Sequence, residues 1–264
     1  MVEVFSVFIG RRKAEDLNLY GMINFIGRGE FINLFDREKE NPYHLPVGTN
    51  FIQLEGPNPN RGLKIGYDRF FLYIDLQDVE GHLIIKGCID SCYEFVERYK
   101  HWFDRHHCSV VQSANKDIFA ALHYNIFSSP VTAKLKVHFF FKEAVPSNSS
   151  QHPCRISGSV VAFHSKYDYT TEYEKRYYRS VLFECPETCP LIRQEGVDFE
   201  MELSRVLVTV PTDCSLLIAV DLSCGIGLTT ERLEETVEFQ LCDSSKEIAV
   251  KGFGIYIDVE WDDK

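Results

Sequence analysis

The second half of this 264-residue chain loosely repeats the first as a series of strand-like runs. Five runs recur in the same order; the first of them carries a glycine and the fourth ends in Asp-Leu. The runs are residues 20–26, 34–36, 51–54, 71–76 and 83–88 in the first half, and 157–163, 182–184, 199–203, 217–222 and 237–242 in the second. The match pairs Asp75 with Asp221, which we interpret as edge or turn devices at strand ends, and Cys88 with Cys242. Because burial and chain reversal explain such positions, the repeat predicts architecture rather than chemistry.

Apolar and polar residues alternate along many runs, for example at 134–139, 198–203 and 253–261. A period of two is typical of a strand with one buried and one solvated face. Turn signals rich in Gly, Pro and Asn separate the runs at intervals of about 8 to 12 residues, a spacing typical of a sandwich or barrel. We therefore predict a mainly β protein, an antiparallel β-sandwich built from two loosely repeated halves.

One stretch departs from the alternation. Between Tyr93 and Phe103 the apolar residues follow the spacing of an amphipathic helix, which predicts one short helical insert near 93–104. We divide the chain into residues 1–128, which carry this insert, and residues 129–264. Because each half has few strands of its own, we expect the two to pack as one compact unit.

The formal net charge is −11, with 39 acidic and 28 basic residues. This balance argues against a general nucleic-acid binder, which neutralises phosphates with a basic face. The sequence has no apolar run close to the roughly 20 residues of a transmembrane helix, and its start lacks the pattern of a signal peptide. We expect a soluble, intracellular, cytoplasmic protein without a membrane partner.

Cysteine usage also agrees with an intracellular protein. The count of nine is odd, and several cysteines lie in apolar runs, where a free thiol behaves as a small hydrophobe. The C-x3-C pairs at 88–92 and 185–189 differ from the C-x2-C and C-x4-C spacings usual for structural zinc, and 185–190 is typical of a turn between strands. We expect reduced thiols, no metal site and no cofactor.

Six short segments carry a resemblance that covers nearly the whole chain: Tyr20-Gly21, 34–37, 54–57 with Arg61, 131–137, 203–205 and 208–211. In these the chain resembles a grass-specific family defined by a domain of unknown function. That domain is also found at the C-terminal end of the jasmonate-induced ribosome-inactivating protein of cereals. The resemblance implies a role in plant stress or defence. Asn58-Pro59-Asn60 and the stretch 93–107 depart from the family pattern.

The resemblance also implies two activities. RNA N-glycosidases use a helical Glu-x-x-Arg, and the close match here, Glu202 to Arg205, falls in a predicted strand, where residues three apart face opposite sides. Recognition of the messenger RNA cap, to which the domain has been likened, needs a cationic base between two aromatic rings. The two tryptophans, Trp102 and Trp261, are expected in a helix and at a strand end. We assign no catalytic residue.

Three arginines near turns are candidate binding residues: Arg37, Arg61 and Arg205. An arginine can hold a carboxylate or phosphate through two parallel hydrogen bonds. It can equally brace a loop to its own neighbours. Convergence of the three in one cleft would identify a site.

A second candidate is the tyrosine-rich segment from Tyr167 to Tyr178, which we predict to be a polar loop. Tyrosines and arginines interleaved in this way can stack on nucleic-acid bases. The candidate residues are Tyr173, Arg176, Tyr177 and Arg179. This loop and the insert around Trp102 are where the halves differ, so we expect a fixed functional site there.

These patterns favour a non-enzymatic protein-interaction or regulatory module with an unidentified protein partner. The sequence has no G-x-S-x-G, phosphate loop or dinucleotide loop. The alternative is a translation-associated protein that binds RNA or the ribosome and is related to ribosome-inactivating proteins. A third class, a carbohydrate binder, would use Tyr167, Tyr169 and Tyr173 as an aromatic platform.

Overall fold

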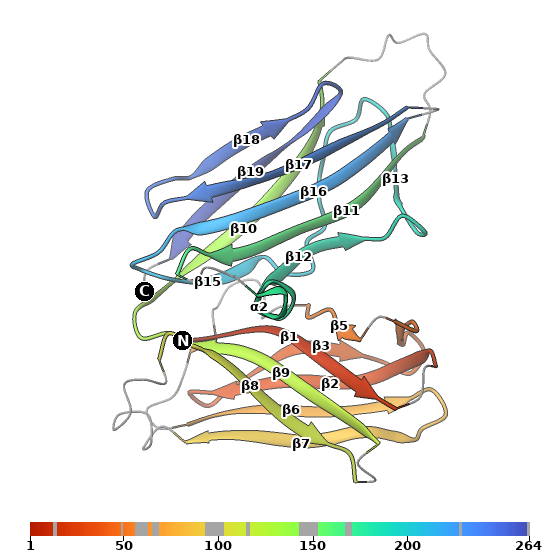
Figure 1. The fold of residues 1–264 in the computed structure, drawn as a ribbon, viewed down its shortest axis with the longest axis vertical. Helices are drawn as coiled ribbons and strands as arrows, with labels where there is room; N and C mark the ends of the chain where they lie inside the picture. Colours follow the sequence, from red (N-terminus) through yellow and green to blue (C-terminus); the bar gives the residue numbers. More distant parts are fainter. Residues whose placement is uncertain are drawn as a thin grey trace. The chain divides into compact units, whose positions relative to one another are not determined.

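The computed structural model describes residues 1–12, 15–48, 50–55, 63–64, 69–92, 103–114, 117–142, 153–166, 171–226 and 229–262. These residues form antiparallel strands and one short helix (Figure 1), which confirms the predicted mainly β, antiparallel fold. The chain divides into two compact units, Met1–Pro130 with Tyr169–Arg179, and Val131–Asp168 with Ser180–Lys264. The packing of the halves into one compact unit stays a prediction.

The first unit contains two sheets and the helix α2 (Glu172–Tyr177). One sheet, in the spatial order β5-β1-β9-β8, is formed by β1 (Val2–Arg11), β5 (Phe51–Ile52), β8 (His106–Gln112) and β9 (Ile118–Ile126). The other, β3-β2-β6-β7, is formed by β2 (Leu17–Gly27), β3 (Glu30–Arg37), β6 (Arg69–Asp78) and β7 (Leu83–Cys92), with β4 (Tyr43–Leu45) paired to β2.

The second unit also contains two sheets. One, in the order β14-β10-β19-β18, is formed by β10 (Pro130–Phe141), β14 (Phe199–Glu200), β18 (Ser245–Ala249) and β19 (Phe253–Asp262), with β15 (Leu207–Pro211) paired to β10. The other, β12-β11-β16-β17, is formed by β11 (Pro153–His164), β12 (Ser180–Cys185), β16 (Leu216–Ile226) and β17 (Thr229–Phe239), with β13 (Leu191–Gln194) paired to β11.

Each unit encloses its own core between its two sheets. In the first unit, alternate residues of β6 (Phe70, Leu72 and Ile74) are fully buried in the same cluster as Val4 and Val7 of β1. In the second, inward residues of β10 and β19 share a core with those of β11 and β16. The period of two in the sequence therefore selects the buried face of each strand.

The two units repeat the same topology. The order β5-β1-β9-β8 in the first matches β14-β10-β19-β18 in the second, and β3-β2-β6-β7 matches β12-β11-β16-β17. The predicted internal repeat is therefore confirmed strand by strand. One predicted pair is wrong: Cys88 lies within β7, whereas Cys242 follows the end of β17.

In each unit, the matched glycine packs closely against the backbone of the matched aspartate on the neighbouring strand. Gly21 in β2 and Gly158 in β11 have φ angles of 117° and 119°, and a Cβ on either would meet the carbonyl oxygen of Asp75 or Asp221 at 2.2 or 2.0 Å. The two aspartates lie inside β6 and β16 rather than at strand ends, which corrects the interpretation as edge or turn devices. Each binds a cation on the next strand. Lys86 Nζ lies 2.6 Å from Asp75, and Arg232 binds Asp221 at 2.7 and 2.9 Å.

The repeat also predicts a stabilising substitution. Asn24 is fully buried in β2, and neither its amide nitrogen nor its amide oxygen has a partner among the described residues. Three positions after the equivalent glycine, the second unit has Val161, also buried. Because an unsatisfied buried amide is costly, Asn24→Val should raise the free energy of unfolding by about 1–3 kcal/mol in urea titrations. The exposed neighbour change Asn33→Val should shift it little, and a less stable Asn24→Val protein would contradict this account.

Two local expectations come out differently. Residues 201–206 are not a strand, because β14 ends at Glu200, so the predicted strand over 198–203 is wrong beyond that point. Glu202 is exposed and Arg205 is buried, and no helix joins them.

The helix predicted near 93–104 falls on residues 93–102, which lie outside the described residues. The described end of that stretch, Phe103 and Asp104, lies in a turn. No helix in the described part of the chain is long and apolar enough to cross a membrane.

Candidate functional site

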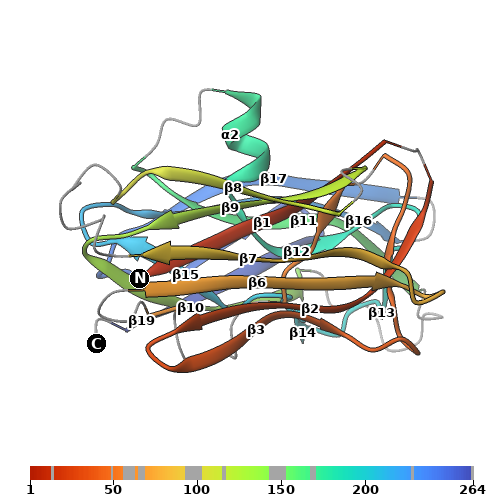
Figure 2. The same ribbon diagram turned by 90° about the horizontal axis from the view of Figure 1, so that it is seen from below.

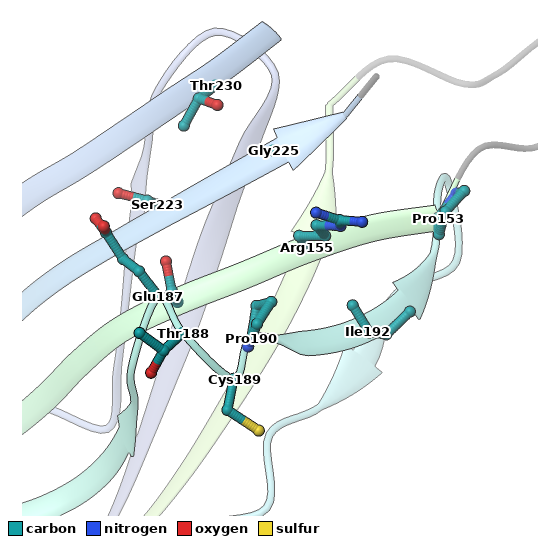
Figure 3. A pocket seen from close by; sticks show the side chains of 11 residues that line it. Pro153, Arg155, Glu187, Thr188, Cys189, Pro190, Ile192, Ser223, Gly225 and Thr230 are labelled. Carbon is teal, nitrogen blue, oxygen red and sulfur yellow. The ribbon is translucent and has the colours of Figure 1, made fainter. Parts of the chain in front are cut away.

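A groove lies on the second unit, on the outer face of the sheet that contains β11, β16 and β17 (Figure 3). It has a volume of about 930 Å³. We call it the Arg155 groove and define it by Arg155 and Ser157 of β11, Ser223 and Gly225 of β16, Thr230 of β17 and the loop 187–190.

Small residues on neighbouring strands explain why the surface is hollow here. In the ladder Arg155 pairs with Gly225, and Ser157 pairs with Ser223. The alternate residues of both strands, such as Ile156 and Cys224, are buried in the core, so these four lie on the opposite side of the sheet, where Ser157 is itself buried in the floor. Serine and glycine fill little space, and the floor of the groove is therefore open.

The loop 187–190 forms one wall of the groove. It connects β12 to β13, which both pair with β11. The Cys189 amide donates to the Pro186 carbonyl at 3.0 Å, and the Cys185 thiol donates to the Cys189 carbonyl at 3.1 Å. These bonds close the turn that the sequence predicted at 185–190. They hold Thr188 and Cys189 along the edge of the groove.

The polar side chains of the groove are available for a ligand. Within the part of the chain that the structure describes, the exposed Arg155 guanidinium has no hydrogen bond or ion pair. The hydroxyl groups of Ser157, Thr188, Ser223 and Thr230 likewise have no partner among the described residues. The groove thus combines five N–H donors with four hydroxyls that can both donate and accept.

The two charged side chains that line the groove, Arg155 and Glu187, point in different directions. Figure 3 shows Glu187 reaching toward Ser223 on β16, while Arg155 lies over β11 on the side of Pro153. Glu187 is close enough to Arg232 to raise the pKa of that guanidinium slightly, although the hydrogen bond to Asp221 raises it more. Among the described residues, no carboxylate forms an ion pair with Arg155, the arginine that lines the groove.

Activation of a thiol or hydroxyl nucleophile needs a base within hydrogen-bond reach. Among the described residues that line the groove there is a thiol, Cys189, but no histidine. The arrangement can bind and orient a ligand through hydrogen bonds and one positive charge.

The predicted tyrosine-rich loop contains a helix, which corrects that expectation. In α2, Thr171 accepts a hydrogen bond from the Glu174 amide at 3.1 Å, and the Glu174 carboxylate binds the Thr171 amide at the same distance. This capping box, Thr-x-x-Glu, is the sequence signal that would have located the helix. Figures 1 and 2 show α2 on the side of the first unit formed by β1, β8 and β9.

A chain of hydrogen bonds attaches this helix to the sheet beneath it. Ser6 Oγ donates to the Tyr177 carbonyl at 2.9 Å, so it accepts from His123 Nδ1 at 3.2 Å. His123 Nε2 then accepts from the Tyr173 hydroxyl at 2.9 Å. The chain requires a neutral imidazole. Burial favours this form, because it lowers the pKa of His123 to about 4.

The structure places three of the predicted binding residues on one helix. Tyr173, Arg176 and Tyr177 share α2, with Arg179 following in the same unit. The Arg176 guanidinium lies 5.2 Å from the ring centre of Phe51 and 5.9 Å from that of Tyr177. These aromatic faces are therefore already covered by a cation of the chain itself.

Two of the three turn arginines, Arg37 and Arg205, lie among the described residues, and each has a partner in its own unit. Arg37, at the end of β3, forms an ion pair with Glu55, and burial raises the pKa of that carboxyl while Arg37 opposes the rise. Arg205 belongs to the second unit, is 3% exposed and donates to Ser180 Oγ at 2.9 Å. Both brace their own surroundings. Arg61 lies outside the described residues.

Sequence reasoning missed the residues of the Arg155 groove. Alternation around Ile156 and Cys224 indicates which neighbours face outward. Yet nothing in the sequence shows that these two segments, 70 residues apart, are adjacent strands. The pairing of Arg155 with Gly225 became visible only with the ladder between β11 and β16.

Two clusters outside the groove have structural roles. Asp78, Glu80 and His82 lie close together, but Asp78 accepts from the amides of both others at 2.9 Å and so closes the turn after β6. Cys154 and Cys224 are buried free thiols with sulfurs 3.0 Å apart, directly behind the groove floor. The eight cysteines whose state is described are all free.

Comparisons with known proteins identify a family. No curated protein matches the chain. Among solved structures it is similar to human GIVD cytosolic phospholipase A2, in complex with methyl gamma-linolenyl fluorophosphonate and alone, at 9% identity and TM-scores of 0.23 and 0.24. These matches cover 98% of this chain but 33% and 32% of those chains, so the chain spans about a third of their length. A family model described as "Domain of unknown function (DUF6598)" matches residues 1–259. The chain therefore belongs to the DUF6598 family.

Proposed function

We propose that the protein is a non-enzymatic protein-interaction module and that the Arg155 groove holds a polar segment of its protein partner. The observation that carries the proposal is a groove of about 930 Å³ whose arginine and hydroxyl side chains have no partners among the described residues. In binding pockets, a small number of placed polar groups fix the orientation of the ligand. A bound polypeptide would satisfy these groups with its own carbonyls, amides and side chains.

Display of random 12-residue peptides on phage tests this proposal. We expect peptides that are retained by the wild-type protein and lost on Ser223→Trp, because an indole on the floor would fill the groove. Thr236→Trp is the matched control, since Thr236 is exposed on β17 of the same sheet and outside the groove. Both variants should keep the wild-type melting temperature. A selection that returns no peptides, or peptides equally retained by Ser223→Trp, would contradict the proposal.

As part of the same proposal, the module acts in plant stress or defence without N-glycosidase activity. This setting rests on the sequence resemblance alone. The lack of depurination is supported by Glu202 and Arg205, which share no helix and differ in burial. Incubation of ribosomes with micromolar protein should release no adenine above a buffer control. Adenine release proportional to protein concentration would overturn the non-enzymatic assignment.

A further inference from the structure

The charge around the Arg155 groove is uneven. Arg232, which pairs with Ser223 in the ladder between β16 and β17, already binds Asp221 through two hydrogen bonds and Glu234 at 3.2 Å. Glu187 lies within electrostatic reach of Arg232. Arg155 is exposed and has no carboxylate partner among the described residues. An anionic ligand group would therefore balance the charge of Arg155.

The space beside Arg155 suits a planar anion. Gly225 is its direct partner on β16, and Thr230 is the partner of Gly225 on β17. A Cβ on Gly225 would touch the Thr230 hydroxyl at 3.5 Å and come within 4.0 Å of the Arg155 Cβ. The missing side chain leaves room for a group that receives two parallel hydrogen bonds from the guanidinium.

The remaining groove groups suit an extended peptide. Ser157 and Ser223 form the adjacent rung of the ladder, and Thr188 lies in the wall. From Pro153 to Ser157 the floor extends for about 13 Å, the length of roughly four extended residues. Hydroxyls at these positions can accept from and donate to the amides and carbonyls of a backbone that runs along β11.

We propose that the groove takes an extended acidic peptide segment, with a glutamate or aspartate carboxylate held by Arg155 and the backbone held by the serine and threonine hydroxyls. This inference rests on the proposed function of the groove. The groove has one unbalanced arginine, whereas phosphate groups on peptides are bound by clusters of arginines. A carboxylate, with its single charge, is therefore favoured over a phosphate.

Two pools of acetylated heptapeptides test the ligand class. The residues around the centre are a mixture of neutral amino acids, and the centre is glutamate in one pool and glutamine in the other. We expect immobilised wild-type protein to enrich the glutamate pool about 10- to 100-fold over the glutamine pool, as measured by mass spectrometry. A third pool with central phosphoserine should be retained less than the glutamate pool.

Variants at Arg155 assign the contact. Arg155→Gln should abolish the preference for the glutamate pool, and Arg155→Lys should restore only part of it, because a lysine cannot form the two parallel bonds. Lys136→Gln is the matched control: it removes an exposed charge from β10, in the other sheet of the unit, and should leave the preference unchanged.

The outcomes separate this inference from the proposed function. Peptides that are lost on Ser223→Trp but show no preference for glutamate, or a preference that persists in Arg155→Gln, would refute the acidic ligand while the groove remains a peptide site. Equal retention of every pool by wild type and Ser223→Trp would contradict both the acidic ligand and the groove as a peptide site. Stronger retention of the phosphoserine pool would refute the carboxylate ligand and show that the groove prefers a phosphate group.

Discussion

Replacement of Gly158 by alanine should lower the free energy of unfolding by about 3–5 kcal/mol, more than most single substitutions do. Gly158 has a φ of 119°, a backbone conformation that costs other residues about 1–3 kcal/mol. In addition, the new Cβ would lie 2.0 Å from the carbonyl oxygen of Asp221, and relief of that overlap requires β11 and β16 to move apart. Urea titration followed by circular dichroism measures the loss.

The same sheet and the repeated unit supply the controls. Gly225→Ala on β16 should change stability by less than about 0.5 kcal/mol, since its Cβ would make only an ordinary contact at 3.5 Å. Gly21→Ala, the equivalent change in the first unit, should destabilise as strongly as Gly158→Ala. A Gly158→Ala protein as stable as Gly225→Ala would show that the glycine is not required by the backbone.

Acidification from pH 6.5 to pH 4 should lower the free energy of unfolding by about 3 kcal/mol through His123 alone. Its pKa is lowered to about 4 by burial, partly opposed by a hydrogen bond to the Ser6 backbone, and an unfolded histidine has a pKa near 6.5. Above pH 6.5, His123 is neutral in both the folded and the unfolded state, and its full contribution to the free energy of unfolding is present. Between 6.5 and 4 only the unfolded state binds the proton, so stability falls; below 4 the loss is complete.

The difference between wild type and His123→Gln isolates this residue. The variant is expected to be less stable at pH 7, because it loses the bond to Tyr173, but to show a shallower fall toward pH 4. His44→Gln, a change at an exposed histidine of β4, should keep the wild-type slope. The groups that face the imidazole are Ser6, Cys108, Tyr173, Tyr177 and Tyr178. Parallel pH curves for wild type and His123→Gln would contradict a buried neutral histidine.

Much of the fold could be predicted from the sequence, because strand periodicity and turn residues are local signals. The alternation over 253–261 matches β19, and the paired glycines, Gly21 and Gly158, occupy equivalent positions in the two units. The six-residue helix α2 was missed because it has no buried residue, so it leaves no apolar stripe in the sequence. Its capping box was the available signal.

The candidate site could not be predicted in the same way. Arg155 and Gly225 are far apart in the chain, and their pairing is set by the order and register of β11 and β16. Conversely, the sequence left open whether Arg37 and Arg205 bind a ligand or brace a loop, and in the structure each has a partner of its own, Glu55 and Ser180. Whether an arginine is free for a ligand depends on its tertiary neighbours.

The placement of α2 has a consequence for synthesis on the ribosome. The segment Tyr169–Arg179 belongs to the first unit, yet in the chain it follows β11 and precedes β12, both strands of the second. Domains generally fold as units while the chain emerges, the N-terminal one first. Here the N-terminal unit cannot be completed when its first 130 residues have emerged. Ser6 and His123 must wait for Tyr177 and Tyr173, so the last step in folding the first unit follows the synthesis of the opening strands of the second.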